Sequence, residues 1–387
     1  MAKDKNGILY EGTIMGFFLA SLVMRHRAKI EGKENLQKLP GPVIFTITHD
    51  SYFEIPSLSR VYRALNPKPF FTIMAKQDFL SGNYLSTNYF KNNALFRSIF
   101  KALDKTGLPK AIFNKLNLIS IPRPFADKLE EKGDELKKEI ADQFSQFKKK
   151  ISEGFSTLIF PEGTTWGFGG LKKVRSSVYQ LVSNAFEQYD KKIYILPINV
   201  KVDRLVKGWK DIFINVGKPQ FVIKSKDDFN QYIFDTLQKL HTITFSQVGA
   251  YYLKRISELS QQAKVEARLT RENLITQLEN AVHEIHSRVQ EKILPAIDAK
   301  LIDRTYLKKK TNRFIRYCLK KKYILKESQK NAQKTYIINL NKVLAQYPEK
   351  IFRKQNPIGF HANELISLGE QAIEPIFREY VLADRFA

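Results

Sequence analysis

Two patterns of apolar and polar positions divide the chain. Up to about residue 225, short apolar runs alternate with helical patterns such as 127–152. Runs of this length, bounded by Pro, Gly and Asn, predict βα units. We therefore expect residues 41–225 to form an α/β domain with a mostly parallel central sheet flanked by helices. The predicted strands lie within 41–48, 69–75, 117–123, 155–162, 193–202 and 211–216.

After residue 225 the pattern becomes helical. Apolar residues recur three and four positions apart, as at Leu253, Ile256 and Leu259, and glycines are few. This is the spacing of helices that pack on one face. Residues 226–387 are therefore predicted to be an all-helical C-terminal extension.

The N-terminal segment, residues 1–40, has an apolar stretch at 7–24 in which Glu11 is the only charge. The stretch is shorter than the roughly 20 apolar residues of a spanning helix. Basic residues follow it, rather than the small-residue cleavage site of a signal peptide. It fits equally a helix at a membrane interface and a core helix.

Composition and charge restrict the possible partners. The chain has 387 residues, 43% hydrophobic and 27% charged, as in ordinary globular proteins, and a net charge of +25. Such an excess of Lys and Arg attracts polyanions, either anionic lipid headgroups or nucleic acid. Cys318 is the only cysteine, so no intramolecular disulfide and no Cys-based metal site can form. The chain fits a reducing cytoplasm.

A basic stretch at residues 304–326 contains no acidic residue and is interleaved with Tyr306, Phe314, Tyr317 and Tyr323. A basic aromatic helix of this kind favours an anionic membrane surface, although a solvated helix face has the same pattern. No nucleic-acid recognition module accompanies it, so nucleic acid is not an expected partner. The cations are Arg304, Lys308, Lys309, Lys310, Arg313, Arg316, Lys320, Lys321, Lys322 and Lys326.

His49 is the first candidate for chemistry, because it follows the apolar run 41–48. In α/β sheets, ligands bind beyond the carboxyl ends of the strands. Neutral imidazole is a suitable base near neutral pH, and a carboxylate assists by accepting the other ring N–H. Glu54 lies five residues on, where a turn into a helix start can fold a carboxylate back onto the ring. By itself this spacing fits a structural histidine better.

Two further blocks end predicted strands. Phe160-Pro161-Glu162-Gly163-Thr164 places a carboxylate beside a glycine turn. Arg123 ends the run 117–123 and offers a planar set of donors suited to phosphate. Each block alone also fits an ordinary strand-end turn. A third run contains Leu196-Pro197-Ile198.

The other histidines give weaker evidence of a functional role. His283 and His286 stand one helical turn apart without a third ligand, so no metal site is expected. His26, His241 and His361 have no acid-rich sequence neighbourhood that marks them as catalytic.

In combination, these blocks resemble the glycerol-3-phosphate and lysophospholipid acyltransferase family, whose hallmark is His-x4-Asp followed by Phe-Pro-Glu-Gly-Thr. The resemblance covers about residues 40–222. It implies direct acyl transfer with His49 as catalytic base assisted by Glu54, without a metal or cofactor and with acyl-CoA or acyl carrier protein as co-substrate. The substrate-binding residues that it implies are Lys76, Arg123, Glu162, Gly163 and Thr164.

The resemblance implies an O-acyltransferase that acts on a lysophospholipid, glycerol phosphate or related polar lipid. Such an enzyme would be cytoplasmic and peripheral on the inner face of a membrane. Two departures matter, since Glu54 stands where the family has aspartate and Thr165 where it usually has arginine. They leave open an alternative, a catalytically weak or inactive lipid- or phosphate-binding protein of the same fold. The acceptor, the acyl length and the oligomeric state are left open.

Overall fold

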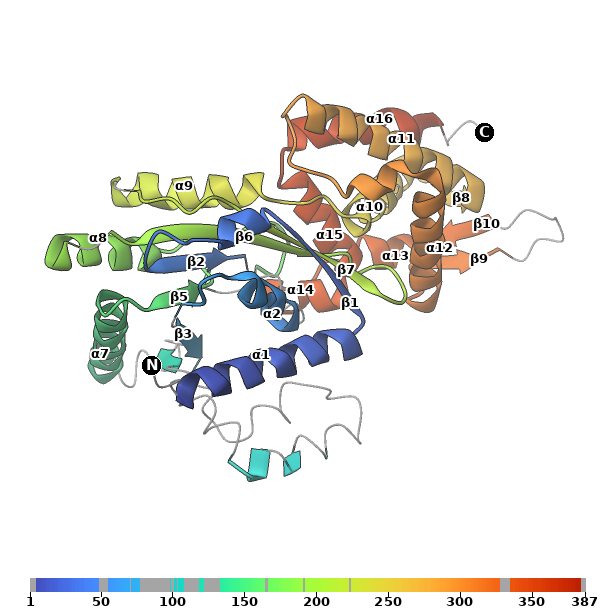
Figure 1. Ribbon diagram of the computed structural model, residues 1–387. Helices are drawn as coiled ribbons and strands as arrows, with labels where there is room; N and C mark the ends of the chain where they lie inside the picture. Colours follow the sequence, from blue (N-terminus) through green and yellow to red (C-terminus); the bar gives the residue numbers. More distant parts are fainter. Residues whose placement is uncertain are drawn as a thin grey trace.

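A computed structural model of the chain shows a sheet-based part and a mostly helical C-terminal part (Figure 1). The structure describes residues 5–48, 55–69, 71–76, 98, 101–102, 104–107, 118–121, 133–163, 166–190, 192–222, 224–327 and 335–383.

The central sheet has seven strands in the order β1-β7-β6-β2-β5-β3-β4. Neighbouring strands are parallel from β6 to β4, and β1 is parallel to β7. The pair β6 and β7 is antiparallel, so β1 and β7 run against the other five strands. The strands are β1 (His26–Glu31), β2 (Val43–Ile47), β3 (Phe71–Lys76), β4 (Leu118–Ile121), β5 (Ser156–Ile159), β6 (Tyr194–Val202) and β7 (Lys210–Val216).

The mostly parallel α/β fold predicted from the sequence is confirmed. Each of the six apolar runs overlaps one strand, and the helical segment 127–152 contains α7 (Gly133–Ser152). One strand was not predicted. Residues 26–31, placed by the sequence in a helical N-terminal segment, form the edge strand β1 beside β7. The polar side chains of this edge strand hide the apolar alternation on which strand prediction depends.

Helices cover both faces of the sheet. On one face α2 (Ile55–Ala64) packs with Val61 against Phe45 and Ile198. On the other face lie α7, α8 (Ser177–Tyr189) and α9 (Lys226–Lys239), whose apolar side chains meet Ile44 and Ile195. The two clusters reflect the alternation of side chains along each strand. Figure 1 shows α9 on one side of the sheet, with α1 and α2 on the other.

The N-terminal helix α1 (Lys5–Val23) packs against α2. The ring of Phe18 lies beneath Arg63, with 4.3 Å between the guanidinium carbon and the ring centroid. Within the described part of the chain, no helix is both long enough and apolar enough to cross a membrane.

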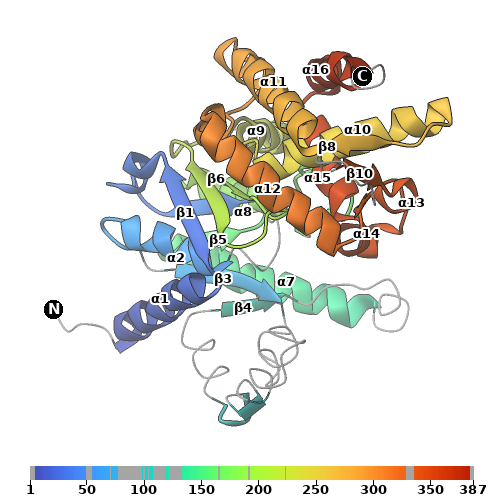
Figure 2. The same ribbon diagram turned by 90° about the vertical axis from the view of Figure 1, so that its right-hand side faces the viewer.

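The C-terminal part surrounds its own hydrophobic core. Most of it is helical, as predicted, but "all-helical" needs correction because three short strands form an antiparallel sheet in the order β8-β10-β9. Strands of three or four residues are too short to show a period-two pattern. Figure 2 shows α10, α11, α12 and α15 grouped beside the main sheet. The elements are α10 (Phe245–Ala263), β8 (Arg268–Thr270), α11 (Arg271–Gln290), α12 (Arg304–Lys320), β9 (Ile324–Lys326), β10 (Thr335–Ile338), α13 (Leu340–Val343), α14 (Glu349–Gln355), α15 (Pro357–Ile366) and α16 (Glu370–Ala383).

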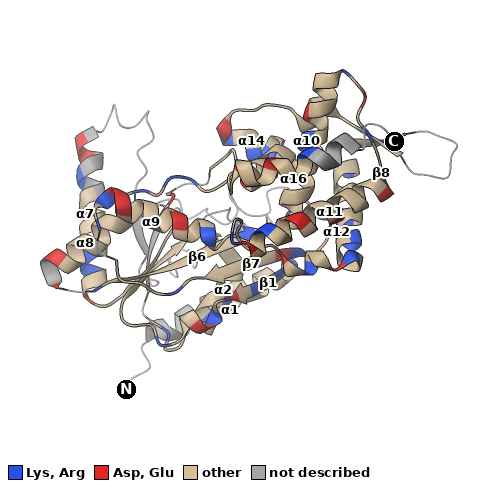
Figure 3. Ribbon diagram, turned by 90° about the horizontal axis from the view of Figure 1, so that it is seen from above, with Lys and Arg blue, Asp and Glu red and all other residues tan. Residues whose placement is uncertain are grey.

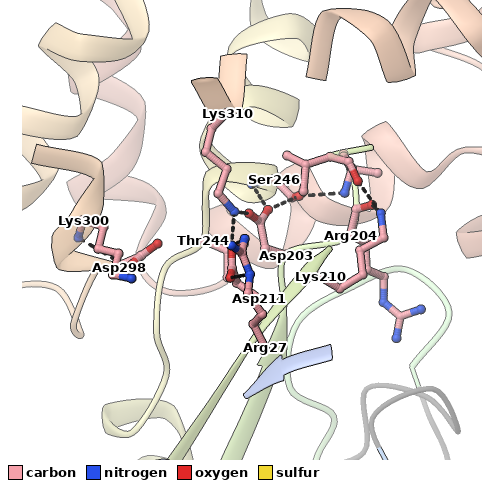
Figure 4. Close-up of polar contacts among 12 residues, drawn as sticks. Arg27, Asp203, Arg204, Lys210, Asp211, Thr244, Ser246, Asp298, Lys300 and Lys310 are labelled. Atoms are coloured by element: carbon pink, nitrogen blue, oxygen red, sulfur yellow. Dashed lines mark hydrogen bonds and ion pairs between the residues drawn. The ribbon is translucent and has the colours of Figure 1, made fainter. Parts of the chain in front are cut away.

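Two kinds of contact fasten this part to the sheet. Leu205 and Val206, in the connection from β6 to β7, insert into the C-terminal core. Beside them, the ammonium of Lys310 on α12 forms ion pairs with Asp203 and Asp211, which lie at the adjoining ends of β6 and β7 (Figure 4). The two parts therefore share an apolar and an ionic junction.

Candidate functional site

A cavity of about 530 Å³ lies at the carboxyl ends of β2, β5 and β6. This volume falls within the range of small-molecule sites. Both parts of the chain form its wall, the sheet part through residues such as Thr48, Glu162 and Lys201, and the C-terminal part through α15. The α15 side and the turn after it contribute Phe360, Glu364, Ser367 and Leu368.

Thr48 fixes the end of β2 at this cavity. Its backbone N–H donates to the carbonyl oxygen of Ile198 at 3.0 Å, and its Oγ1 accepts from the backbone N–H of Val200 at 2.8 Å. Thr48 is buried and lines the cavity. The chain therefore leaves β2 at the cavity wall, at the residue that precedes His49.

Glu162, in the Phe-Pro-Glu-Gly-Thr block, lines the same cavity and is only 3% exposed. Its Oε2 accepts from the backbone N–H of Lys172 at 2.9 Å. The turn is closed by the N–H of Gly163, which donates to Phe160. Gly163 has φ +70°, in the left-handed region that favours glycine. The block thus holds a buried carboxylate at the end of β5.

The other predicted site residues are placed only in part. Lys76 ends β3, where its backbone pairs with Ile121 of β4. The side chain of Lys76 and the whole of His49, Glu54, Arg123 and Thr164 lie outside the described residues. Of the predicted side chains, the structure therefore brings Glu162 to the cavity, and Gly163 forms the turn that follows it.

A series of buried ionic and polar contacts joins the two parts at the wall of the cavity. Nζ of Lys201 on β6 lies 2.8 Å from Oε1 of Glu364 on α15, and Nδ1 of His361 lies 2.6 Å from Oε2 of the same carboxylate. Gln247 continues the series, since its Nε2 donates to Oε2 of Glu364 at 3.4 Å and its side-chain amide lies against His241. Burial alone would raise the pKa of Glu364, but Lys201 and His361 hold it well below its usual range. The carboxylate is therefore ionised at neutral pH.

Sequence reasoning missed this series of contacts. His361 was set aside for want of an acidic neighbourhood, yet Glu364 follows it by three residues, the spacing that joins side chains on one helix face. That signal was available in the sequence. The pairing of Glu364 with Lys201 was not, because only packing brings α15 to β6.

Two buried asparagines also line the cavity and were missed. Asn199 and Lys201 lie two positions apart on the face of β6 that α9 covers, and Asn230 lies on α9. Polar residues at alternate positions of an otherwise apolar strand were the available signal for Asn199. Nothing in the helical pattern distinguished Asn230.

The comparisons with known proteins agree with the sequence motifs. Residues 27–201 match the family model Acyltransferase, a span of somewhat less than half of the chain. The match supports acyl transfer as the general class of reaction and lipid biosynthesis as its setting. No curated protein matches the chain.

Among solved structures, the chain is similar to the crystal structure of the 1-acyl-sn-glycerophosphate (LPA) acyltransferase PlsC from Thermotoga maritima. The identity is 14%, the TM-score is 0.38, and the similarity covers 62% of this chain and 82% of that one.

Proposed function

We propose that this chain is an O-acyltransferase that moves a fatty acyl group from an acyl thioester, acyl-CoA or acyl carrier protein, to a hydroxyl of a polar lipid. The acceptor class comprises lysophospholipids, glycerol phosphate and related lipids. One observation carries the proposal: Thr48, which adjoins the candidate base, and Glu162, from a block more than a hundred residues later, line one cavity. The family match over residues 27–201 supports it.

The proposed chemistry needs one base and a site for the acceptor. His49 accepts the proton of the acceptor hydroxyl while the oxygen attacks the thioester carbonyl carbon. The C–S bond breaks, the new ester C–O bond remains, and the proton passes from His49 to the departing thiolate. Glu54 assists His49, while Glu162 and Arg123 hold the acceptor.

Replacement of His49 tests the proposal. The purified His49→Ala variant should release no free thiol from an acyl thioester with a panel of lysolipids, while its thermal unfolding matches that of the wild type. The matched control is His283→Ala, since His283 is an exposed histidine on α11. Full activity of His49→Ala would refute the proposed base. A wild-type protein that releases no thiol with any acceptor would instead favour the non-enzymatic alternative.

We also propose that the protein binds the inner face of an anionic membrane through α1. Met15, Leu19, Leu22 and Val23 are exposed at helical spacing, which forms an apolar stripe. The stripe ends beside the exposed Trp209, since the backbone of Lys210 donates to the carbonyl oxygen of Arg25 at 3.0 Å. Apolar and aromatic groups next to cations suit a bilayer interface.

The basic helix α12 supplies charge but not the expected aromatic face. Phe314 and Tyr323 are buried in the C-terminal core, and so is the cation Lys310. The outer face of α12 carries a groove lined by Thr305, Lys308, Lys309, Asn312, Arg313 and Arg316. Figure 3 shows Lys and Arg positions along α12. This face can attract anionic lipid by charge alone.

Vesicle flotation distinguishes the contribution of α1 to membrane binding from that of α12. Leu19→Glu with Val23→Glu should abolish binding to vesicles that contain anionic lipid, whereas Lys308→Glu with Lys309→Glu should weaken it mainly at low salt. A wild-type protein that does not float with anionic vesicles at low salt would defeat the membrane proposal.

A further inference from the structure

The cavity wall combines apolar side chains with several hydrogen-bond acceptors. Carboxylates of Glu162, Asp227 and Glu364 and amides of Asn199, Asn230 and Gln238 belong to it. Glu162 and Glu364 have partners within the protein, but a hydrocarbon chain buried against Asn199 and Asn230 would leave their Oδ1 atoms without hydrogen bonds, which is unfavourable. The cavity therefore suits the polar end of a lipid better than its acyl chain.

Two of the amides are buried and have unused acceptors. Asn199 and Asn230 are 2% and 8% exposed, and Oδ1 of each accepts no hydrogen bond from any described residue. At Asn199 the amide orientation is fixed, because Nδ2 donates to the carbonyl oxygen of Leu237 at 2.7 Å. The other end of the amide is therefore Oδ1, which can only accept a hydrogen bond. Buried acceptors without partners are rare in proteins, and a ligand that donates hydrogen bonds would satisfy them.

The charge of the described wall does not call for an anion. Its buried cation, Lys201, is already paired with Glu364. The other lysine of the wall, Lys173, is exposed, as is Asp227, while Glu162 adds a buried carboxylate. A phosphate placed against this wall would meet carboxylates rather than surplus cations.

Flat apolar groups complete the wall. Trp166, Phe234 and Phe360 line the same cavity. Ligand sites commonly combine aromatic surface with a few fixed polar groups that set orientation. A saturated ring presents C–H groups from its faces and hydroxyl donors from its rim, which matches aromatic surfaces beside amide acceptors.

We propose that this cavity binds the headgroup of the acyl acceptor and that the headgroup is a ring bearing several adjacent hydroxyl groups, as in a sugar or inositol. The inference rests on the proposed acyl transfer, because only that function makes the bound ring the headgroup of an acyl acceptor. Binding of the headgroup can nevertheless be measured without turnover. Asn199 and Asn230 accept hydrogen bonds from ring hydroxyls. Phe360 and Glu364 make the C-terminal part a wall of the acceptor site, which assigns that part a role in substrate selection.

Ligand-detected NMR on the full chain tests the binding. The probes are methyl glucoside, myo-inositol and inorganic phosphate, and the key variant is Asn230→Leu, because Oδ1 of Asn230 accepts no hydrogen bond from the described part of the protein. The matched control is Asn184→Leu on α8, outside the cavity. At least one ring polyol should bind the wild type and the control equally and bind Asn230→Leu about tenfold more weakly. Phosphate should not displace it.

The two polyol arms distinguish a sugar from an inositol headgroup. The inference is overturned if neither polyol binds the wild type, if Asn230→Leu binds as the wild type does, or if phosphate displaces the polyol.

A thiol-release assay with glycosylated and phosphorylated lysolipids keeps the two proposals separable. Polyol binding without thiol release from any acceptor would defeat acyl transfer and leave the headgroup site standing. Turnover of lysophosphatidate without polyol binding would leave acyl transfer standing and defeat the headgroup site. If the wild type both binds a polyol and releases thiol, Asn230→Leu should raise KM for the glycosylated acceptor and leave kcat nearly unchanged.

Discussion

Nζ of Lys201 lies 2.8 Å from Oε1 of Glu364, and this ion pair joins strand β6 to helix α15 across the wall of the cavity. The two side chains are 10% and 3% exposed, so water screens the pair little. It therefore couples the sheet to the C-terminal part at the candidate site.

Glu364→Leu should destabilise the protein by about 3–5 kcal/mol, because it removes the carboxylate that pairs with the buried Lys201 ammonium. The double variant Lys201→Met with Glu364→Leu should regain much of that loss, since the buried ammonium is then removed together with the carboxylate. Urea unfolding measures both. Equal losses in the single and the double variant would show that the ion pair is not the cause.

Lys310→Met should cost a similar free energy of unfolding, about 3–5 kcal/mol, because it leaves Asp203 and Asp211 buried without their shared cation. Burial raises the pKa of Asp203, but Lys310 more than offsets this and holds it below its usual value. The matched control is Lys309→Met, an exposed neighbour that should change stability by less than about 0.5 kcal/mol. A loss in Lys310→Met no larger than in the control would contradict the ionic junction.

Gly169→Ala should destabilise more than Gly154→Ala. Both glycines have φ in the left-handed region, +101° and +95°, so alanine costs about 1 kcal/mol or more at each. A methyl group at Gly154 would meet open space, whereas at Gly169 it would overlap the carbonyl oxygen of Phe360 on α15. The clash should add at least about 1 kcal/mol, measurable by chemical unfolding. Equal costs would mean that α15 does not hold its place against this loop.

Stability should fall as the pH drops from about 6.5 to about 4, partly through His26. Burial, followed by the charges of Arg204 and Arg60, lowers the pKa of this ring to about 4, while in the unfolded chain it is near 6.5. Between these values the unfolded state binds the additional proton. The free energy of unfolding therefore decreases toward acid pH, by up to about 1.4 kcal/mol per pH unit from this group.

His26→Gln removes the titrating group, so its unfolding free energy should depend less steeply on pH over the same window. Parallel pH profiles for the variant and the wild type would show that His26 titrates alike in both states.

Much of the α/β fold could be predicted because its signals are local. Each of the six apolar runs became a strand, since burial on both faces requires continuous apolar sequence. The edge strand β1 carries polar side chains and is strand only because β7 pairs with it. The strands β8 to β10 are likewise too short to show the alternating apolar pattern that predicts a strand.

The candidate site divides in the same way. The sequence alone singled out Glu162 and the segment that follows Thr48 as candidates, because strand-end blocks are contiguous motifs, and Glu162 and Thr48 line one cavity. Only the tertiary structure decided that Asn199 and Asn230 share that cavity and that Glu364, 163 positions from Lys201, closes one side of it. Periodicity records which face of an element is buried, whereas the partner that covers that face depends on how distant elements pack.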